Sequence, residues 1–154
     1  GTLNLNGTLT LKNGISVAGP ANFTGPVVAT SVATGNLQLD GDLRLTHHIV
    51  AGGTIPGITR GTATGGGGTV SLSGSDTSGT ITINTGGSPP AGCLANITFS
   101  KRFANTPRVL VSPVGPGAGN LNYYIERSTS GFTLCTTNAA AAGESFSFDY
   151  WAVE

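Results

Sequence analysis

Few side chains in this sequence have the type and spacing that catalysis requires. The chain of 154 residues holds seven Asp and Glu residues, spread thinly, and Glu144 and Asp149 suit the surface of a strand as well as acid–base work. Both histidines stand side by side, at His47 and His48, so the Ser, His and Asp order of a catalytic triad is not found. A polysaccharide-cleaving enzyme would need paired carboxylates on a larger scaffold. We therefore predict that the protein is not an enzyme.

The two cysteines, Cys93 and Cys135, match no zinc-binding spacing, and the sequence leaves open whether they are bonded to each other. On a regular strand Cys93 alternates in phase with Ile97 and Phe99, which indicates a core face. Cys135 alternates with Thr133, which indicates the opposite face. This parity argues against a disulfide, although a β-bulge would reverse the phase of one strand.

A repeat near the start of the chain indicates a fibrous structure. Residues 3–11 read L-x-L-N-G-T-L-x-L, and residues 37–45 read L-x-L-D-G-D-L-x-L. Leucines two positions apart lie on one face of a strand, and Asn-Gly or Asp-Gly favours a bend or tight turn. Apart from Phe23, the aromatic residues all lie between Phe99 and Trp151. The first part of the chain therefore cannot bury enough apolar surface within one molecule to offset its conformational entropy.

Two interpretations of the repeat are open. Each unit is either a small isolated hairpin, which is only marginally stable in water, or a bent strand whose leucines meet those of two other chains at a common axis. The second interpretation explains why the unit recurs and why aromatic side chains, which would not fit near a narrow axis, are missing. We predict trimer contacts through Leu3, Leu5, Leu9, Leu11, Leu37, Leu39, Leu43 and Leu45.

This arrangement resembles the shafts of viral and bacteriophage tail fibres, in which short strands of three chains wrap into β-spirals or β-prisms. The resemblance covers residues 1–50. It implies a homotrimer and a place on a virion tail fibre or on an extracellular cell surface. The chain begins at Gly1 and not at Met, which suggests a piece of a longer fibre.

His47 is the candidate metal ligand. It continues the odd-numbered positions of Leu43 and Leu45, so in a trimer three copies would converge on the axis, where three imidazoles could hold a transition-metal ion. Alternatively, His47 and His48 only close the shaft by hydrogen bonding, or the strand register breaks there. We predict no other cofactor.

After the repeats, a Gly- and Thr-rich passage at residues 51–68 predicts a flexible linker. Its four consecutive glycines lack the following Lys-Ser or Lys-Thr of a phosphate-binding loop. From residue 69 onward, strand-like runs alternate with turn residues, which predicts a small antiparallel β-sandwich. The expected strands are Thr69–Ser73, Thr80–Asn84, Cys93–Phe99, Arg108–Ser112, Leu121–Arg127, Phe132–Thr137 and Ser145–Val153. We expect an all-β protein with a trimeric shaft at 1–50, a linker at 51–68 and a sandwich knob at 69–154.

The last predicted strand has apolar residues on both faces. Phe146, Phe148 and Tyr150 alternate on one face, which suits the core of the sandwich. Trp151 and Val153 lie on the other face and so point towards a second buried surface. In a trimer that surface is the subunit interface.

Four short motifs follow one another along the segment 97–154 and form one framework pattern. They are Ile97-Thr98-Phe99, Phe103 with Pro107-Arg108-Val109, Gly131-Phe132-Thr133-Leu134, and Tyr150-Trp151-Ala152-Val153. This framework resembles H-type lectin-like domains, which are six-stranded sandwiches that assemble as trimers. The resemblance implies carbohydrate binding near the contacts between subunits. None of that family's sugar-contacting residues can be matched one by one, so none is transferred.

The candidate ligand-binding loop runs from Gly115 to Tyr124. Amide and phenol groups suit sugar hydroxyls and sugar faces, and both types stand beside a Gly-rich tip at residues 117–120. Tyr123 is also in phase with Ile125, which makes a core position the alternative. The candidate ligand-binding residues are Asn120, Asn122, Tyr123, Tyr124 and Arg127. Secondary candidates, which suit solvated surface charges equally well, are Arg102, Arg108 and Glu126.

The charge balance and hydropathy argue against two classes of function. Seven Lys and Arg residues balance seven Asp and Glu residues, and no basic run occurs, so binding to nucleic acid through phosphates is not expected. No apolar stretch approaches the roughly 20 residues that span a bilayer, so membrane insertion is not expected. The leading hypothesis is adhesion, in which the shaft projects the knob and the knob binds a glycan or another receptor on a host or cell surface. The alternative is a structural trimerisation cap with no ligand of its own.

Overall fold

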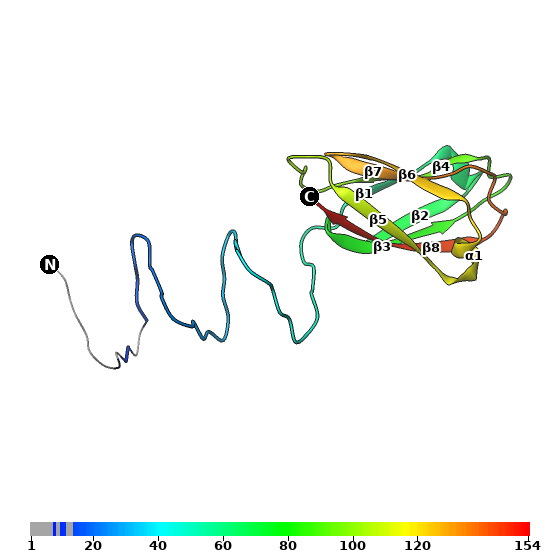
Figure 1. Ribbon diagram of the computed structural model, residues 1–154. Helices are drawn as coiled ribbons and strands as arrows, with labels where there is room; N and C mark the ends of the chain where they lie inside the picture. The colour runs from blue at the N-terminus through cyan, green and yellow to red at the C-terminus, as the bar shows by residue number, and fades with distance from the viewer. Residues whose placement is uncertain (1–7, 9, 12–13) are drawn as a thin grey trace. The chain divides into compact units, whose positions relative to one another are not determined.

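The computed structural model describes residues 8, 10–11 and 14–154. The chain divides into two units, Gly1–Arg44 and Leu45–Glu154. In the first unit, the described residues form no helix or strand and are all exposed to solvent (Figure 1). The backbone bends at Asp40 and Gly41, where the Asp-Gly pair of the repeat predicts a bend.

The leucines of the predicted trimer contacts are exposed wherever the structure describes them. Their exposed fractions lie between 47% and 66% for Leu11, Leu37, Leu39, Leu43 and Leu45. The other members of the set, Leu3, Leu5 and Leu9, lie outside the described residues. A single chain thus leaves the described leucines in contact with water, and their burial by two further chains stays a prediction.

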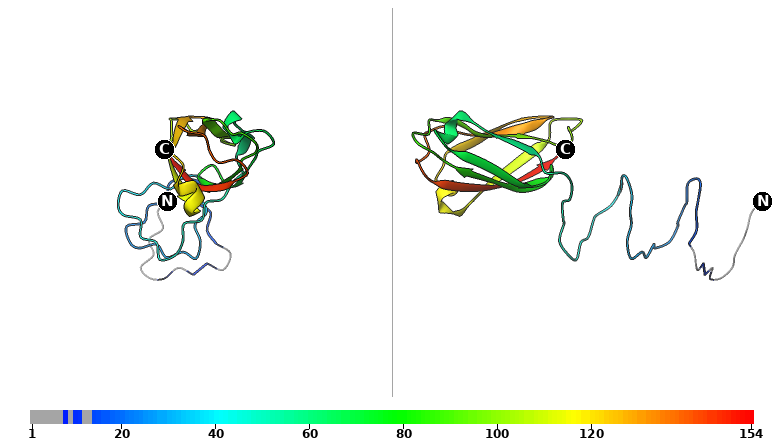
Figure 2. Two further views of the ribbon diagram at one scale, coloured as in Figure 1. Left: turned by 90° about the vertical axis from the view of Figure 1, so that its right-hand side faces the viewer. Right: turned by 180° about the vertical axis from the view of Figure 1, so that it is seen from behind.

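The second unit folds into two antiparallel sheets of four strands each, which face each other as a sandwich (Figures 1 and 2). One sheet has the strand order β1-β4-β7-β6, and the other has the order β2-β3-β8-β5. The elements are β1 (Gly57–Arg60), η1 (Thr62–Thr64), β2 (Thr69–Gly74), β3 (Ser78–Asn84), β4 (Gly92–Thr98), β5 (Arg108–Val114), α1 (Gly115–Gly119), β6 (Tyr123–Ser128), β7 (Gly131–Thr136) and β8 (Ser145–Val153). The prediction of an all-β sandwich is confirmed. No helix in the described part of the chain is long and apolar enough to cross a membrane.

Alternation along β8 builds one wall of the core between the sheets. Phe146, Phe148, Tyr150 and Ala152 are all buried, as their shared parity predicts. The ring of Phe148 packs against Tyr123 of the opposite sheet, with the ring centroids 5.1 Å apart. Aromatic side chains contributed by both sheets therefore hold the two layers together.

Part of the predicted linker belongs to the sandwich. β1 pairs with β4, and Ala63 and Thr64 of η1 are fully buried. The N–H of Gly61 donates to the carbonyl oxygen of Leu94 (2.8 Å), and a Cβ at Gly61 would lie only 1.9 Å from the carbonyl oxygen of Cys93. Glycine and threonine are typical of flexible linkers, but at this position glycine is what allows two backbones to touch.

Cys93 and Cys135 form a disulfide bond between β4 and β7, so the parity argument against it was wrong. The register shifts between Cys93 and Ala95, because Cys93 pairs with Cys135 whereas Ala95 pairs with Leu134. Leu94 and Ala95 are consequently both fully buried. The extra residue of this β-bulge takes Cys93 out of the regular alternation and sets it directly opposite Cys135.

Candidate functional site

The sandwich has two ends that differ in the segments they carry. Gly57, where β1 begins, pairs with Thr98, and Thr98 pairs with Gly131 at the turn between β6 and β7. We call this the proximal end. At the opposite end, α1 joins β5 to β6, and the segment 137–144 joins β7 to β8 (Figure 1). We call this the distal end, and the predicted ligand-binding loop lies there.

The tip of the predicted loop is a helical turn. Hydrogen bonds from the N–H of Asn120 to the carbonyl oxygen of Pro116 (3.2 Å) and from Leu121 to Ala118 (3.2 Å) close α1. Ala118 is buried, whereas Asn120 is exposed. The tip is thus less open than its Gly-rich sequence indicates, and Asn120 is the polar side chain that it presents.

Tyr123 and Arg127 are tied to the free edge of β5. The Tyr123 hydroxyl donates to the carbonyl oxygen of Val111 (2.9 Å), and Nη1 of Arg127 donates to that of Pro107 (3.1 Å). In its sheet β5 pairs only with β8, and Pro113 has no N–H to offer a further strand. Tyr123 therefore occupies the core position that strand parity gave as the alternative, and both side chains cover an exposed sheet edge.

Asn122 and Tyr124, the next two predicted ligand-binding residues, do not form a cluster with the other candidates. The backbone carbonyl of Asn122 accepts a hydrogen bond from the N–H of Thr137 (2.9 Å), while the Asn122 side chain is exposed. Tyr124 stands on the outer face of β6, in register with Cys135, and is 41% exposed. The structure thus separates the five predicted ligand-binding residues instead of gathering them at one place.

A hollow of about 300 Å³ at the distal end contains one predicted residue, Asn120, and two that sequence reasoning did not assign to a binding site, Asn138 and Glu144. We call it the distal hollow. Its other lining residues are Gly117, Leu121, Ala139, Ala141 and Phe146. The lining comes from two separate segments, 117–121 and 138–146. In the sequence, Asn138 and Glu144 are marked only by the Gly- and Ala-rich stretch between them, which follows a strand.

A buried threonine fixes the backbone beside the distal hollow. Thr85 is 6% exposed, and its hydroxyl donates to the carbonyl oxygen of Ala141 (2.7 Å) and accepts from the N–H of Glu144 (2.9 Å). Its own N–H donates to the carbonyl oxygen of Glu144 (2.8 Å). The segment 137–144 is therefore anchored, while the side chains of Asn138 and Glu144 remain exposed.

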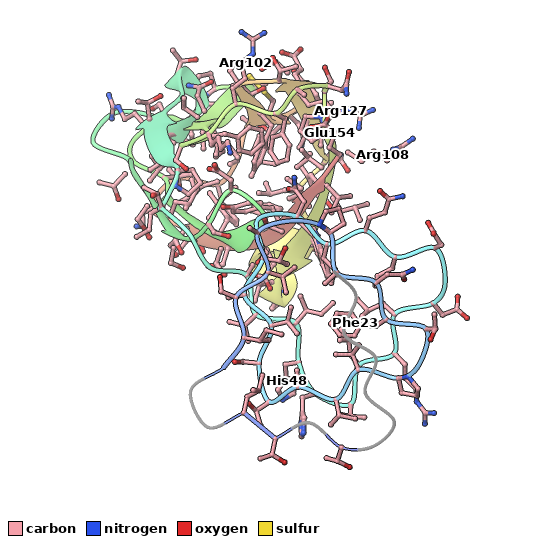
Figure 3. All side chains as sticks on the ribbon, turned by 90° about the vertical axis from the view of Figure 1, so that its left-hand side faces the viewer. Phe23, His48, Arg102, Arg108, Arg127 and Glu154 are labelled. Carbon is pink, nitrogen blue, oxygen red and sulfur yellow. A yellow bond between two sulfur atoms is a disulfide. The ribbon has the colours of Figure 1, made fainter. Side chains whose placement is uncertain are left out.

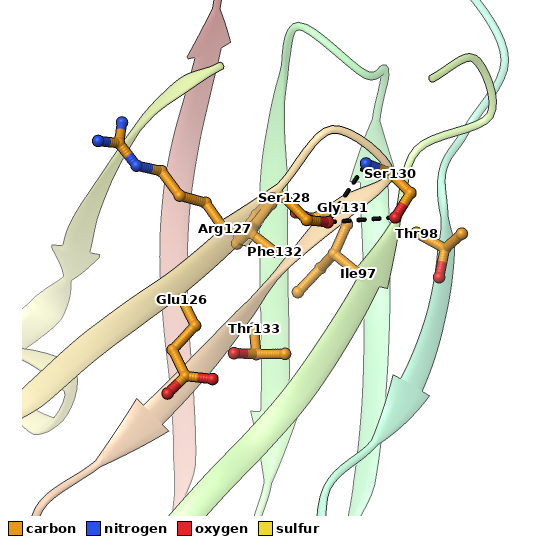
Figure 4. A pocket seen from close by; sticks show the side chains of 9 residues that line it. All are labelled: Ile97, Thr98, Glu126, Arg127, Ser128, Ser130, Gly131, Phe132 and Thr133. Atoms are coloured by element: carbon orange, nitrogen blue, oxygen red, sulfur yellow. Dashed lines mark hydrogen bonds between the residues drawn. The ribbon is translucent and has the colours of Figure 1, made fainter. Parts of the chain in front are cut away.

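A second hollow of about 300 Å³, the lateral hollow, lies over β6 and β7 near their turn (Figure 4). Glu126 and Thr133 are register partners, and Arg127 points away from Glu126. The hydroxyl oxygens of Ser128 and Ser130 are 3.1 Å apart, and the N–H of Ser130 donates to Ser128 Oγ (3.2 Å). These serines stabilise the turn itself, and Glu126 is the carboxylate of the lining, which also includes Arg127, Thr98 and Thr133.

Trp151 and Val153 lie on the outer face of β8, as their parity predicts. Trp151 is 46% exposed, and its register partner Leu110 on β5 is 69% exposed. Val153, two residues along β8 from Trp151, is also exposed on this face. The polar pair of Ser112 and Asp149 separates them from Val114, so Trp151, Leu110 and Val153 form a separate apolar surface, which we call the β5–β8 patch.

The secondary candidates and His47 are at the surface. Nε of Arg102 donates to Thr129 Oγ1 (2.8 Å), and Figure 3 shows Arg102 and Arg108 reaching away from the sandwich. His47 is exposed, and the described residues contain no group of three or more His, Cys, Asp or Glu side chains that could hold a metal ion. The predicted axial site draws one ligand from each of three chains, so one chain does not test it.

No match was found when the chain was compared with protein-family models, with curated protein sequences and with solved structures. The protein is therefore classified by its own architecture, an antiparallel two-sheet β-sandwich preceded by a Leu- and Val-containing segment without regular structure in its described residues.

Proposed function

We propose that this chain is a non-enzymatic adhesion protein in which three copies associate through the leucine repeats and carry sandwich knobs that bind a surface glycan. The observation that carries the proposal is the exposure of the repeat leucines, from Leu37 to Leu45, in a single chain. Burying one Leu side chain is worth about 1.5–3 kcal/mol, and three chains with two repeats each offer many such side chains to a common axis. If these leucines remained exposed to water after association, they would contribute no burial free energy to the trimer.

The β5–β8 patch supports association of the knobs. Large aromatic residues are enriched at the centres of protein interfaces and contribute much of the binding free energy there. Trp151 with Leu110 provides such a centre on an otherwise polar sheet face. We propose that this patch contacts a neighbouring copy.

The disulfide supports a location outside the cytosol. Bonds such as Cys93–Cys135 form and persist mainly in secreted proteins and at virion or cell surfaces. A virion tail fibre or an extracellular cell surface is therefore the location that we propose, and a glycan or another receptor on a host or cell surface is the proposed partner.

A specific observation favours the alternative of a trimerisation cap without a ligand. Tyr123 and Arg127, two of the five predicted ligand-binding residues, are used by the fold to cover the edge of β5. A cap needs only the repeat and the β5–β8 patch, and it would leave both hollows empty.

The mass in solution tests the trimer, and a glycan array tests adhesion. Light scattering should give three times the chain mass of 15.3 kDa, and a folded monodisperse monomer would overturn the shaft and the interface together. On an array, an adhesion protein should show reproducible binding to a set of related glycans, whereas a cap should show none.

A further inference from the structure

We propose that the distal hollow binds a neutral, hydroxyl-rich sugar through the side chains of Asn120, Asn138 and Glu144. The inference rests on the adhesive function proposed above and adds the place of binding and the class of ligand. It is carried by the polar groups that the distal hollow brings together and by the absence of Lys and Arg from its lining.

The polar groups match the hydrogen-bonding pattern of sugar hydroxyls. An Asn amide supplies two N–H donors and one acceptor oxygen, whereas an ionised carboxylate only accepts. Asn138 Oδ1 already accepts from the Thr137 hydroxyl (3.1 Å), so Asn138 offers chiefly its NH₂ donors. Together with the Asn120 amide and the Glu144 carboxylate, they can serve neighbouring hydroxyls, each of which both donates and accepts. Hydrogen bonds to the charged carboxylate are stronger than those between neutral groups, so Glu144 should contribute most.

The charge of the hollow selects against acidic sugars. Glu144 is the charged residue among those that line it, and the lining includes no Lys or Arg. A sialic acid, a sulfated sugar or a phosphate would meet a carboxylate without a cation to compensate, and like charges at short distance repel. The ligand class is therefore a neutral glycan.

The shape and anchoring of the hollow suit a small rigid ligand. Its volume of about 300 Å³ is at the lower end of the range for small-molecule sites, which admits one or two sugar rings. Leu121, which is half-buried beside the buried Phe146, provides apolar surface for the C–H face of a ring. Because Thr85 already holds the backbone at Ala141 and Glu144, little ordering should be required on binding.

The lateral hollow is the rival site, so its carboxylate provides a comparison variant that is matched to Glu144→Gln and separates the two hollows. Glu126 is an exposed carboxylate on β6 and lies outside the distal hollow. The test is a glycan array with neutral and with sialylated or sulfated oligosaccharides, followed by titration calorimetry with the best neutral oligosaccharide. Four proteins are compared, namely the unmodified chain, Asn138→Ala, Glu144→Gln and Glu126→Gln.

We expect neutral oligosaccharides to bind the unmodified chain and Glu126→Gln equally. Asn138→Ala and Glu144→Gln should each weaken binding about tenfold or more, the effect of losing one good hydrogen bond to a buried or charged partner. A fourth variant, Gly117→Ala, places a methyl group 3.6 Å from the Phe146 ring, in ordinary contact. It should lower affinity by narrowing the hollow while the melting temperature does not fall, because alanine is favoured over glycine within a helix.

Two outcomes would overturn the inference in distinguishable ways. If glycans bind but acidic ones are preferred, or if the distal variants bind as well as Glu126→Gln, the site or the ligand class is wrong and adhesion stands. If no glycan binds to the trimeric unmodified chain, both this site and adhesion through glycans are wrong, and adhesion to another kind of receptor or the trimerisation cap is the function left.

Discussion

Two carboxylates organise the loop between β4 and β5 at the scale of single residues. Asp76 accepts hydrogen bonds from the N–H and hydroxyl of Ser100 (both 2.7 Å) and from the N–H of Lys101 (2.8 Å). Glu154 accepts from the N–H groups of Ala104 (3.1 Å) and Asn105 (2.8 Å). Four backbone N–H groups of one loop thus find carboxylate acceptors, although the two acids are far apart in sequence.

Asp76→Ala should lower the free energy of unfolding by about 1–3 kcal/mol, the range for leaving hydrogen-bonding groups without their charged partner. The matched control is Glu126→Ala, which removes an exposed carboxylate from a strand and should change stability by less than about 0.5 kcal/mol. Chemical denaturation of both variants measures the difference. Equal effects would mean that the Asp76 bonds contribute nothing beyond surface charge.

Tyr150 makes the stability of the sandwich depend on alkaline pH. Burial, with a smaller contribution from the Asp76 carboxylate, raises its pKa to about 12 from the ordinary value of 10.0. Its hydroxyl donates to the carbonyl oxygen of Ser75. Above pH 10 the unfolded chain releases this proton while the folded chain keeps it, so stability should be full below pH 10 and fall as the pH rises towards 12. Denaturation curves at pH 9, 10 and 11 should show the fall.

Tyr150→Phe is the control for this titration. The variant should lose about 1–3 kcal/mol at neutral pH, because the Ser75 carbonyl loses its donor, but the part of the alkaline fall that comes from Tyr150 should disappear. A variant with the same slope between pH 9 and pH 11 as the unmodified chain would show that Tyr150 is not the group responsible.

At the scale of elements, strand periodicity predicted the positions of the strands better than composition did. The seven predicted strands match β2 to β8 within two residues at every boundary, because alternation of apolar and turn residues directly reflects which face is buried. β1 was missed, since its Gly57-Ile58-Thr59-Arg60 run is embedded in glycines that are typical of a linker. Composition alone does not separate a flexible glycine from one that allows close backbone contact.

The disulfide and the distal hollow are two features that strand periodicity does not predict. Parity assumes an uninterrupted strand, and one inserted residue, between Cys93 and Ala95, reverses it. Asn120 was predicted because its loop is polar and Gly-rich. Asn138 and Glu144 were not, because pairing and packing of β6, β7 and β8 bring them to Asn120, and one segment's pattern does not contain that information.

Reduction of Cys93–Cys135 should destabilise the sandwich by about 2–5 kcal/mol, the usual cost of removing a native disulfide from a small domain. The bond closes a loop with a sequence separation of 42 residues, and opening it gives the unfolded chain more conformations. Denaturation midpoints with and without a reducing agent measure the effect, and the double variant Cys93→Ser with Cys135→Ser should reproduce it. Two titratable thiols in the unreduced, unfolded protein would contradict the bond.

At the scale of the whole molecule, the repeat predicts which residues face the axis of the proposed trimer. Leu39→Asp should disrupt assembly far more than Gln38→Asp, because an unpaired carboxylate buried at an axis is costly whereas one at the surface is not. Leu39 is 49% exposed in a single chain, so the substitution should have little effect on an isolated molecule. Light scattering of the two variants measures assembly, and equal loss of trimer in both would mean that the register of the repeat is wrong.

Substitution of Trp151 tests whether the sandwich knobs of neighbouring copies also contact each other. Its side chain is 46% exposed in one chain and stands opposite Leu110, so within a single sandwich Trp151→Ala should change stability little. If a neighbouring copy covers the β5–β8 patch, the substitution removes a buried aromatic group and should cost on the order of 3 kcal/mol per chain. The loss should then appear as dissociation on dilution.

Ser147→Ala is the matched control for Trp151→Ala, because Ser147 lies on the same strand and the same face as Trp151 but is paired with Val114, outside the patch of Trp151, Leu110 and Val153. Light scattering over a dilution series should show the Trp151 variant dissociating at concentrations where the Ser147 variant and the unmodified chain remain trimeric. A Trp151 variant that stays trimeric down to nanomolar concentration would place the interface elsewhere. The leucine repeats alone would then have to hold the three chains together, and the patch would need another partner.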